Sequence, residues 1–278
     1  MRYAGSIFIA VMLAVVAPFA NAQSIGEDSN RNVSYSTAEA FARAPFAEGE
    51  KLTYEAKINK VLRGIPVADL SFSVEDAASP ELFSVFARAE SKGALLWLFR
   101  YSFLQEYRSS IDPVRLRALK TSKHDVQKER VRDGEATFDY GERRVTYVES
   151  DPKEPLKAPR RIASGISDRT QDLISSVYSL RAAPLAVGKK FTFSVSDSGL
   201  VYEVPVKVTA REQQKTIFGK VWCFRVEPQV FGPGRMIEQE GSMVIWITDS
   251  SRRIPVRAQV KSPIGRVEIK LKAAENLK

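Results

Sequence analysis

The sequence predicts a mainly β protein, with antiparallel strands in one or two open, curved sheets or half-barrels. Three observations carry this prediction. Apolar and polar residues alternate with period two over most of the chain from Lys51 onward, as in strands with one buried face. Turn-forming residues separate these segments. A single long stretch, at about Asp168–Arg181, has the residue spacing of an amphipathic helix, and we expect that helix to be central.

The first 22 residues are predicted to be a secretory signal peptide. Arg2 supplies a positive charge, residues 7–20 are uniformly apolar, and Ala20-Asn21-Ala22 offers small residues at the cleavage site. The apolar run is shorter than the roughly 20 residues that a membrane-spanning helix needs. We therefore expect cleavage after Ala22 and a periplasmic or secreted protein.

Residues 23–44 are predicted to be a polar N-terminal arm with a short helix at 37–44, capped by Thr37 and ended by Pro45. A first β unit follows at 45–150. Asp133-Gly134 is predicted to form a hairpin turn, and residues 140–142 a second turn. The segments with strand-like alternation in this unit are 51–58, 67–74, 82–89, 115–121, 136–140 and 144–148.

Residues 151–183 are interpreted as a connection followed by the helix. Three prolines between 150 and 161 indicate a surface segment, Ser167 or Asp168 can cap the helix, and Pro184 stops it. A second β unit is predicted at 184–278. Its strand-like segments are 191–195, 201–208, 220–226, 242–247, 255–260 and 267–271.

The two predicted β units begin with similar sequences. Residues 45–54 (PFAEGEKLTY) and 184–193 (PLAVGKKFTF) share five identical positions, and each follows a helix candidate and opens a strand. A repeat within a sequence predicts a repeated unit in the fold. Two β units of like topology, an internal duplication, is one interpretation. The other is a common sequence for ending a helix and starting a strand, used twice.

Several motifs resemble a bacterial family of exported proteins known as domain of unknown function 3108. They are residues 172–181 (DLISSVYSLR) with the following Pro184-Leu185 and Val187-Gly188, the opening Phe46, Gly49-Glu50, Leu52 and Tyr54, and residues 245–249 (IWITD) followed by 253–257 (RIPVR). The resemblance spans about residues 45–274. It implies an all-β, envelope-associated protein and supplies no active-site residues.

Composition argues against most catalytic chemistries. One Cys and one His exclude a disulfide framework and a Cys/His zinc site, so we expect no metal and no cofactor. His124 lies among charged residues and is predicted to be a surface residue at a strand end, and Cys223 to be a buried apolar residue. Nucleophile and phosphate-binding motifs are absent.

A glycan hydrolase that uses paired carboxylates is a weak third hypothesis. The candidate pairs are Glu48/Glu50, Glu75/Asp76 and Glu238/Glu240.

The segment 91–104 interrupts the alternation with five consecutive large apolar residues, Leu95 to Phe99. A strand buried on both faces, a short helix, or a lip that contacts lipid or covers a cavity would each explain it. Bases beside aromatic residues suit a lipid headgroup boundary. The predicted ligand-binding residues are Lys92, Leu96, Trp97, Phe99, Arg100, Tyr101 and Phe103.

The net charge of +9 is spread along the chain, without the concentrated basic stripe typical of nucleic-acid binding. The leading hypothesis is a non-catalytic, exported envelope protein that binds a lipid or another amphipathic or anionic ligand, and peripheral membrane contact is compatible with it. The alternative is a protein–protein interaction or scaffold module in envelope assembly. We expect no nucleic-acid partner.

Overall fold

The computed structural model describes residues 44–59, 64–76, 82–263 and 265–277. The predicted signal peptide and nearly all of the N-terminal arm with its short helix lie outside these residues. Within the described part of the chain, no helix is long and apolar enough to cross a membrane.

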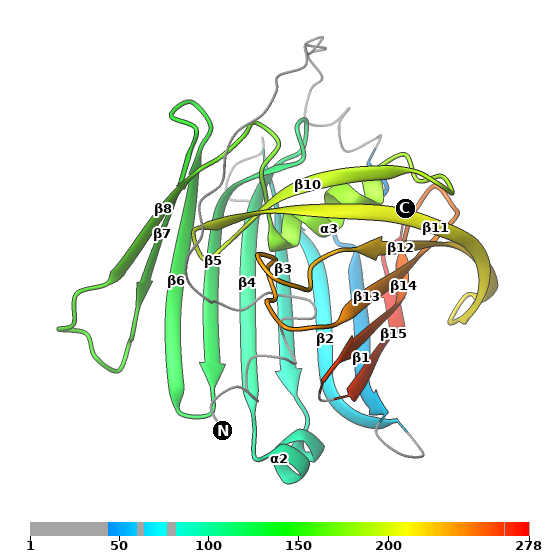
Figure 1. Ribbon diagram of the computed structural model, residues 1–278, viewed down its shortest axis with the longest axis horizontal. Helices are drawn as coiled ribbons and strands as arrows, with labels where there is room; N and C mark the ends of the chain where they lie inside the picture. The colour runs from blue at the N-terminus through cyan, green and yellow to red at the C-terminus, as the bar shows by residue number, and fades with distance from the viewer. Residues whose placement is uncertain (1–43, 60–63, 77–81, 264, 278) are drawn as a thin grey trace.

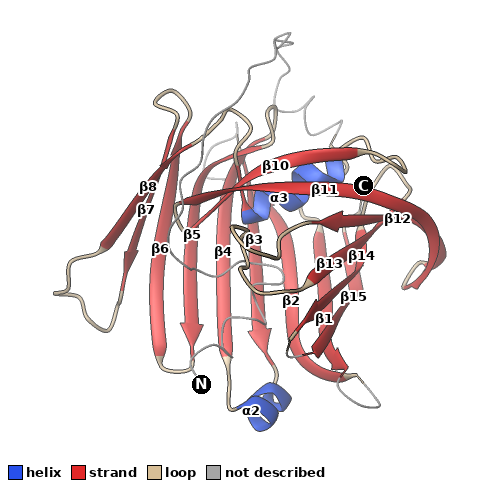
Figure 2. Cartoon of the chain, viewed as in Figure 1, coloured by secondary structure: helices blue, strands red, loops and turns tan. Residues whose placement is uncertain are grey.

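The described chain forms one 15-stranded sheet with two helices (Figures 1 and 2), which confirms the mainly β prediction. The sheet order is β8-β7-β6-β5-β4-β3-β2-β1-β15-β14-β13-β12-β11-β10-β9, and all neighbours are antiparallel except β9 and β10. The elements are β1 (Lys51–Asn59), β2 (Ile65–Asp76), β3 (Phe83–Ser91), α2 (Gly93–Phe99), β4 (Phe103–Asp112), β5 (Arg117–Gln127), β6 (Arg130–Asp139), β7 (Arg144–Ser150), β8 (Arg160–Gly165), β9 (Gln171–Asp172), α3 (Leu173–Ala182), β10 (Lys190–Asp197), β11 (Leu200–Thr216), β12 (Gly219–Pro228), β13 (Ser242–Thr248), β14 (Pro255–Ser262) and β15 (Gly265–Glu275).

The sheet curls strongly, so that β10 and β11 cross in front of the long wall formed by β2–β6 (Figure 1). Pairing of β1 with β15 joins the strands of the two predicted units within this one sheet. The Ser164 hydroxyl on β8 donates a hydrogen bond to the carbonyl oxygen of Gly199, 2.7 Å away, so β8 meets the β10–β11 turn. The helix α3 lies inside the curve and contacts β3, β4, β5, β9 and β10.

The concave face, which carries α3, has an apolar side and a polar side. On β1 the inward residues Leu52, Tyr54, Ala56 and Ile58 are all buried, as the period-two pattern predicts. On β4 and β5 several of the inward positions are instead polar, between the buried apolar residues Phe103, Ile111 and Ala118. Buried examples are Gln105, Tyr107, Ser109, Thr121 and Asp125.

The helix begins later than predicted. Asp172, not Ser167 or Asp168, is the N-cap of α3: its carboxylate accepts from the Ser175 backbone N–H at 2.5 Å, and the Ser175 hydroxyl accepts from the Asp172 backbone N–H. The residues before Asp172 instead form a turn, in which the Thr170 N–H bonds to the Ser167 carbonyl, and the short strand β9. Pairing of β9 with β10 outcompetes an earlier helix start.

The predicted hairpin at Asp133-Gly134 is wrong. Both residues lie inside β6, and the turn between β5 and β6 falls at Lys128, whose φ is 56°. The Tyr147 side chain packs directly against the backbone of Gly134. A Cβ at this position would lie 2.1 Å from the Tyr147 hydroxyl oxygen. A glycine inside a strand often marks such a close approach. The predicted turn at 140–142 is confirmed.

The two similar openings of the β units fold alike. Gly49 and Gly188 both have positive φ, 76° and 88°. The Gly49 N–H donates to Val74 O at 2.9 Å, and the Gly188 N–H donates to Val208 O at 2.8 Å. Residues 45–54 and 184–193 therefore make the same turn, and each segment starts a strand. That strand pairs with the following strand of the chain, β1 with β2 and β10 with β11.

Candidate functional site

An apolar helix protrudes at one end of the sheet (Figure 1). The helix α2 is anchored by Leu95, which is fully buried, while Trp97 is 78% exposed and Leu96 51% exposed. The helix ends at Arg100, whose φ is 53° and whose N–H donates to Leu96 O at 2.8 Å. The five apolar residues thus form a short helix, one of the three structures that the broken alternation allowed, with three of them in solvent.

The structure separates the predicted ligand-binding residues into two groups. Leu96, Trp97 and Arg100 are exposed on or beside α2, and we call Leu96, Trp97 and Leu98 the apolar tip. Tyr101 and Phe103 are buried, with ring centroids 6.2 Å apart, and Phe99 packs partly against the core. Lys92 forms ion pairs with Glu55 at 3.2 Å and Asp69 at 2.9 Å.

Exposed basic residues lie on turns at the same end of the sheet as the apolar tip. The register places the β5–β6 turn beside the start of β4, and the β14–β15 turn beside the start of β2, so both turns share the α2 end of the sheet. These turns expose Lys128, Arg130, Lys261 and Arg266, against one acid, Glu129.

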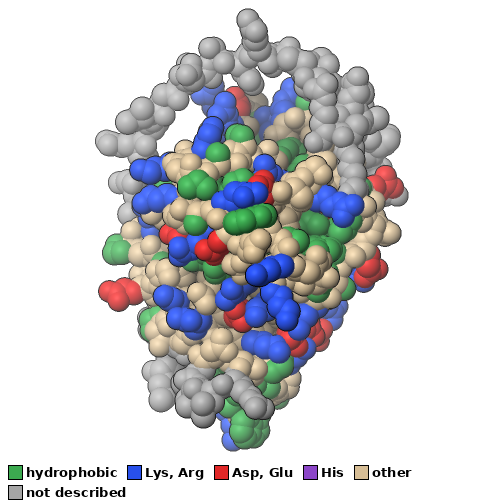
Figure 3. Space-filling model, turned by 90° about the vertical axis from the view of Figure 1, so that its right-hand side faces the viewer, with side chains coloured by type: hydrophobic (Ala, Val, Ile, Leu, Met, Phe, Trp, Pro, Cys, Tyr) green, Lys and Arg blue, Asp and Glu red, His purple; other side chains and the backbone are tan. Residues whose placement is uncertain are grey.

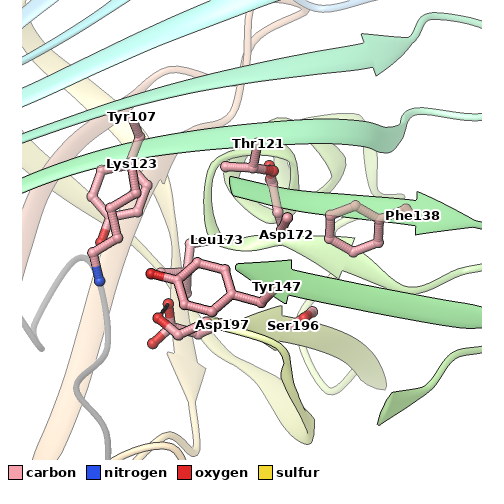
Figure 4. A pocket seen from close by; sticks show the side chains of 11 residues that line it. Tyr107, Thr121, Lys123, Phe138, Tyr147, Asp172, Leu173, Ser196 and Asp197 are labelled. Carbon is pink, nitrogen blue, oxygen red and sulfur yellow. Dashed lines mark hydrogen bonds between the residues drawn. The ribbon is translucent and has the colours of Figure 1, made fainter. Parts of the chain in front are cut away.

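A second feature is a small pocket on the concave face, lined by polar and apolar side chains that include Asp172 and Leu173 at the N-terminus of α3 (Figure 4). Its empty volume is about 330 Å³, including open solvent at the mouth. Tyr107 and Lys123 face each other from neighbouring strands, and the Lys123 nitrogen lies 5.4 Å from the Tyr107 ring centroid. The residues lining the pocket are Tyr107, Thr121, Lys123, Ala136, Phe138, Tyr147, Asp172, Leu173, Ser196, Asp197 and Ser198.

Charge in this pocket is concentrated on Lys123 and Asp197. Burial opposes the charged form of Lys123, but the carboxylates of Asp197 and Asp125 favour it, and the pKa of Lys123 lies above its ordinary value. Burial raises the pKa of Asp197, and it raises the pKa of Tyr147 to about 12. The lysine is therefore a cation at neutral pH, and Tyr147 keeps its proton.

Sequence reasoning missed Tyr107 because it predicted no strand at 103–112, and it missed Lys123 because it ended the strand-like segment 115–121 at Thr121. The strand β5 continues to Gln127, so Thr121, Lys123 and Asp125 share the concave face. His124 is therefore within a strand rather than at its end, and its Nδ1 lies 2.6 Å from the carboxylate of Asp133 on the outer face. The alternation of polar residues from 121 to 125 was the available signal.

Cys223 and the carboxylates considered for glycan hydrolysis are buried, ion-paired or exposed singly, as follows. Cys223 is buried, as expected. Glu50 is ion-paired with the buried Arg181, Glu75 pairs with Arg108, and Glu238 and Glu240 are exposed. Among the described residues, no group of three or more His, Cys, Asp or Glu side chains is arranged to hold a metal ion.

A family model described as "Protein of unknown function (DUF3108)" matches residues 53–272. The chain belongs to this family. The resemblance seen in the motifs is thereby confirmed, and the DUF3108 model covers every strand pair that forms the wall of the pocket. No curated protein matches the chain.

One solved structure supports the fold. A β-barrel-like protein of domain of unknown function DUF1849 from Brucella abortus aligns with a TM-score of 0.56 and 12% identity, over 81% of this chain and 96% of that one. A protein from Bacteroides fragilis, described as exported and of YmcC-like fold, aligns with a TM-score of 0.36 and 11% identity, over 84% and 98% of the two chains. The first of these likenesses shows the fold of this DUF3108 protein; neither shows its function.

Proposed function

We propose that this DUF3108 protein is an exported, non-catalytic envelope protein that docks on an anionic lipid surface through the apolar tip and binds an amphipathic molecule. The observation that carries the proposal is the 78% exposure of Trp97 at the end of an anchored helix. Exposed aromatic and aliphatic side chains in one patch are typical of interaction sites. The predicted signal peptide supports an extracytoplasmic place for this contact.

The surrounding charge favours lipid over a neutral apolar partner. Arg100, Lys128 and Arg130 are exposed at the α2 end and add attraction to anionic headgroups, worth about 1 kcal/mol per base near the surface. Trp97 and Leu96 supply the apolar part, since burying such side chains contributes roughly 1.5–3 kcal/mol each. Lys92 adds less, because Glu55 and Asp69 already balance its charge.

Vesicle sedimentation tests the proposal. We expect the purified protein to sediment with phosphatidylglycerol-containing vesicles and less with phosphatidylcholine vesicles, and Trp97→Ser to lower the partition coefficient at least tenfold. Trp222→Ser is the matched control, because Trp222 is also exposed, at 45%, but lies on β12 away from α2. Equal binding of Trp97→Ser and the wild type would overturn the proposal.

A scaffold role is the second candidate, and the edge of the sheet favours it. The strand β8 has only β7 as a sheet neighbour, and Arg160, Arg161 and Ala163 are exposed along it. An exposed edge strand can pair with a strand of another protein. The scaffold role would be favoured if the wild-type protein sediments with none of the vesicles but copurifies with one other protein.

A further inference from the structure

The outward side of β14, β15 and β1 carries a local excess of positive charge. Successive residues of a strand point to opposite faces, so the positions between the buried residues of these strands point outward. Lys and Arg side chains predominate over Asp and Glu on the side of the molecule that carries β11–β15 (Figure 3). We call the outward side of these three strands the basic face; its bases are Lys51, Lys57, Arg257, Lys261, Arg266, Lys270 and Lys272.

Glu55 lies near the middle of the basic face and gathers the bases around it. One oxygen of its carboxylate is 3.2 Å from the ammonium nitrogens of both Lys57 and Lys272, and the other oxygen is 3.2 Å from that of Lys92. Asp69 balances Lys92 at 2.9 Å. The single charge of Glu55 is thus shared by two further lysines, and one positive charge stays unbalanced.

Glu268 on β15 has the same role. Its carboxylate pairs with Arg257 at 2.5 Å and with Lys270 at 3.1 Å. Both Glu268 and Glu55 are 16% exposed, whereas the lysine partners on β15 are about half exposed. The two carboxylates therefore fix the bases in place and leave a positive surplus that a ligand can reach. The third acid of the face, Glu275, lies opposite Lys51 at its far end.

The surplus ends at β2, because acids outnumber bases on the outward positions of the next three strands. Across β2, β3 and β4 the cross-strand register places these acids and bases on the same outer surface. The positive charge is therefore localised in the fold, although its residues are spread along the sequence. The outward acids of β2–β4 are Asp69, Glu75, Glu90, Glu106 and Asp112, and the bases are Arg88 and Arg108.

The chemistry of the basic face narrows the class of partner. Its described outward positions include no Val, Leu, Ile, Met or aromatic side chain, whereas protein interfaces and membrane-inserting surfaces need an apolar part. Each of the three strands also has a neighbour on both sides, so none offers a free edge to an added strand. The uncharged outward residues Thr53 and Gln259 are hydrogen-bonding groups. These features favour a soluble, hydroxyl-rich polyanion.

We propose that the basic face binds an acidic polysaccharide. Carboxylates of the polymer pair with Lys57, Lys270 and Lys272, and its hydroxyl groups bond to Thr53 and Gln259. Alternate residues of a strand are about 7 Å apart, so an extended chain that follows the strands meets several bases in succession. The predicted signal peptide favours a polysaccharide over a nucleic acid. This inference goes beyond the proposed function and does not rest on it, because the apolar tip supplies no residue to the basic face.

Binding of the purified protein to immobilised polygalacturonate, a linear polysaccharide with one carboxylate on each sugar, tests the proposal. We expect Lys270→Gln combined with Lys272→Gln to weaken binding by about tenfold or more, because two charge-assisted contacts are lost. Arg88→Gln combined with Arg108→Gln is the matched control. It removes the same charge from ion-paired, similarly exposed residues on the outer surface of β3 and β4, so binding stays within about twofold of the wild type.

The outcomes distinguish a localised site from general attraction. Equal losses in the two double variants, or polyglutamate binding as tightly as polygalacturonate, would overturn the polysaccharide proposal, and so would the absence of binding by the wild type at low salt. Either lysine variant alone lowers affinity about threefold, which keeps the test decisive if the double variant does not fold. Trp97→Ser keeps full polygalacturonate binding whether or not it loses vesicle binding, so failure of one proposal is separable from failure of the other.

Discussion

Arg181 on α3 and Glu50 before β1 form a two-point ion pair in the protein interior. The guanidinium nitrogens lie 2.5 and 2.8 Å from the two carboxylate oxygens, and each side chain is 1% exposed. The same guanidinium donates to the carbonyl oxygens of Pro45 and Arg252, and Phe46 packs beside it. This pair fastens the end of the helix to the start of the first strand.

Glu50→Ala is expected to destabilise the protein by about 3–5 kcal/mol, because it leaves the Arg181 charge buried without its partner. Urea unfolding followed by far-UV circular dichroism measures the change. Glu75→Ala is the control, since its exposed pair with Arg108 is worth at most about 1 kcal/mol. Similar losses in the two variants would contradict this account.

Gly134→Ala is expected to cost about 1–3 kcal/mol, because the new methyl group overlaps the Tyr147 ring and hydroxyl. A thermodynamic cycle with Tyr147→Ala should show that the two costs are not additive, since the smaller side chain removes the clash. Gly93→Ala provides the control: it is the first residue of α2 and has open space around its Cβ position, so the stability stays within about 0.5 kcal/mol.

Leu95→Ala and Trp97→Ala should differ sharply although the residues are two positions apart. Leu95 is fully buried, and its truncation is expected to cost about 2–5 kcal/mol. Trp97 is mostly in solvent, so its truncation should change the free energy of unfolding by less than about 0.5 kcal/mol. Thermal melting of both variants checks this; a large loss for Trp97→Ala would make it a core residue.

Stability should fall on acidification through Glu55. Partial burial opposes ionisation of this carboxyl, but hydrogen bonds from Lys272, Lys57 and Lys92 outweigh it and lower the pKa to about 2. A folded-state pKa below the unfolded value means that the contribution is complete above about pH 4.5 and disappears as the pH falls toward 2. Urea unfolding at several pH values across this range measures the free energy of unfolding. That free energy should fall by about 1 kcal/mol less in Glu55→Gln than in the wild type.

The Cys223 thiol should be inert in the native protein. It is fully buried, and burial raises its pKa to about 11, so little thiolate exists at pH 8. A coloured disulfide reagent at pH 8 should react with one thiol only after denaturant is added. Rapid reaction without denaturant would show that the strand β12 opens in the native state.

Part of the fold could be read from local pattern. The alternation of Leu52, Tyr54, Ala56 and Ile58 located β1 because strand periodicity depends only on which face is buried. The break in alternation at Leu95–Phe99 likewise marked α2 as unusual. The start of α3 was predicted too early because Ser167 and Asp168 are good caps in isolation, whereas the pairing of Asp172 with β10 is a tertiary effect.

The sequence by itself determined the β class, the family, and the composition of the apolar tip, since each is written in contiguous residues. Only the tertiary structure decided that Lys123 of β5 and Ser196 of β10 line one pocket, and that Glu50 meets Arg181, 131 positions away. Alternation reports which face of a strand is buried but not which distant strand or helix covers it. That choice depends on the curl of the whole sheet and on packing against α3.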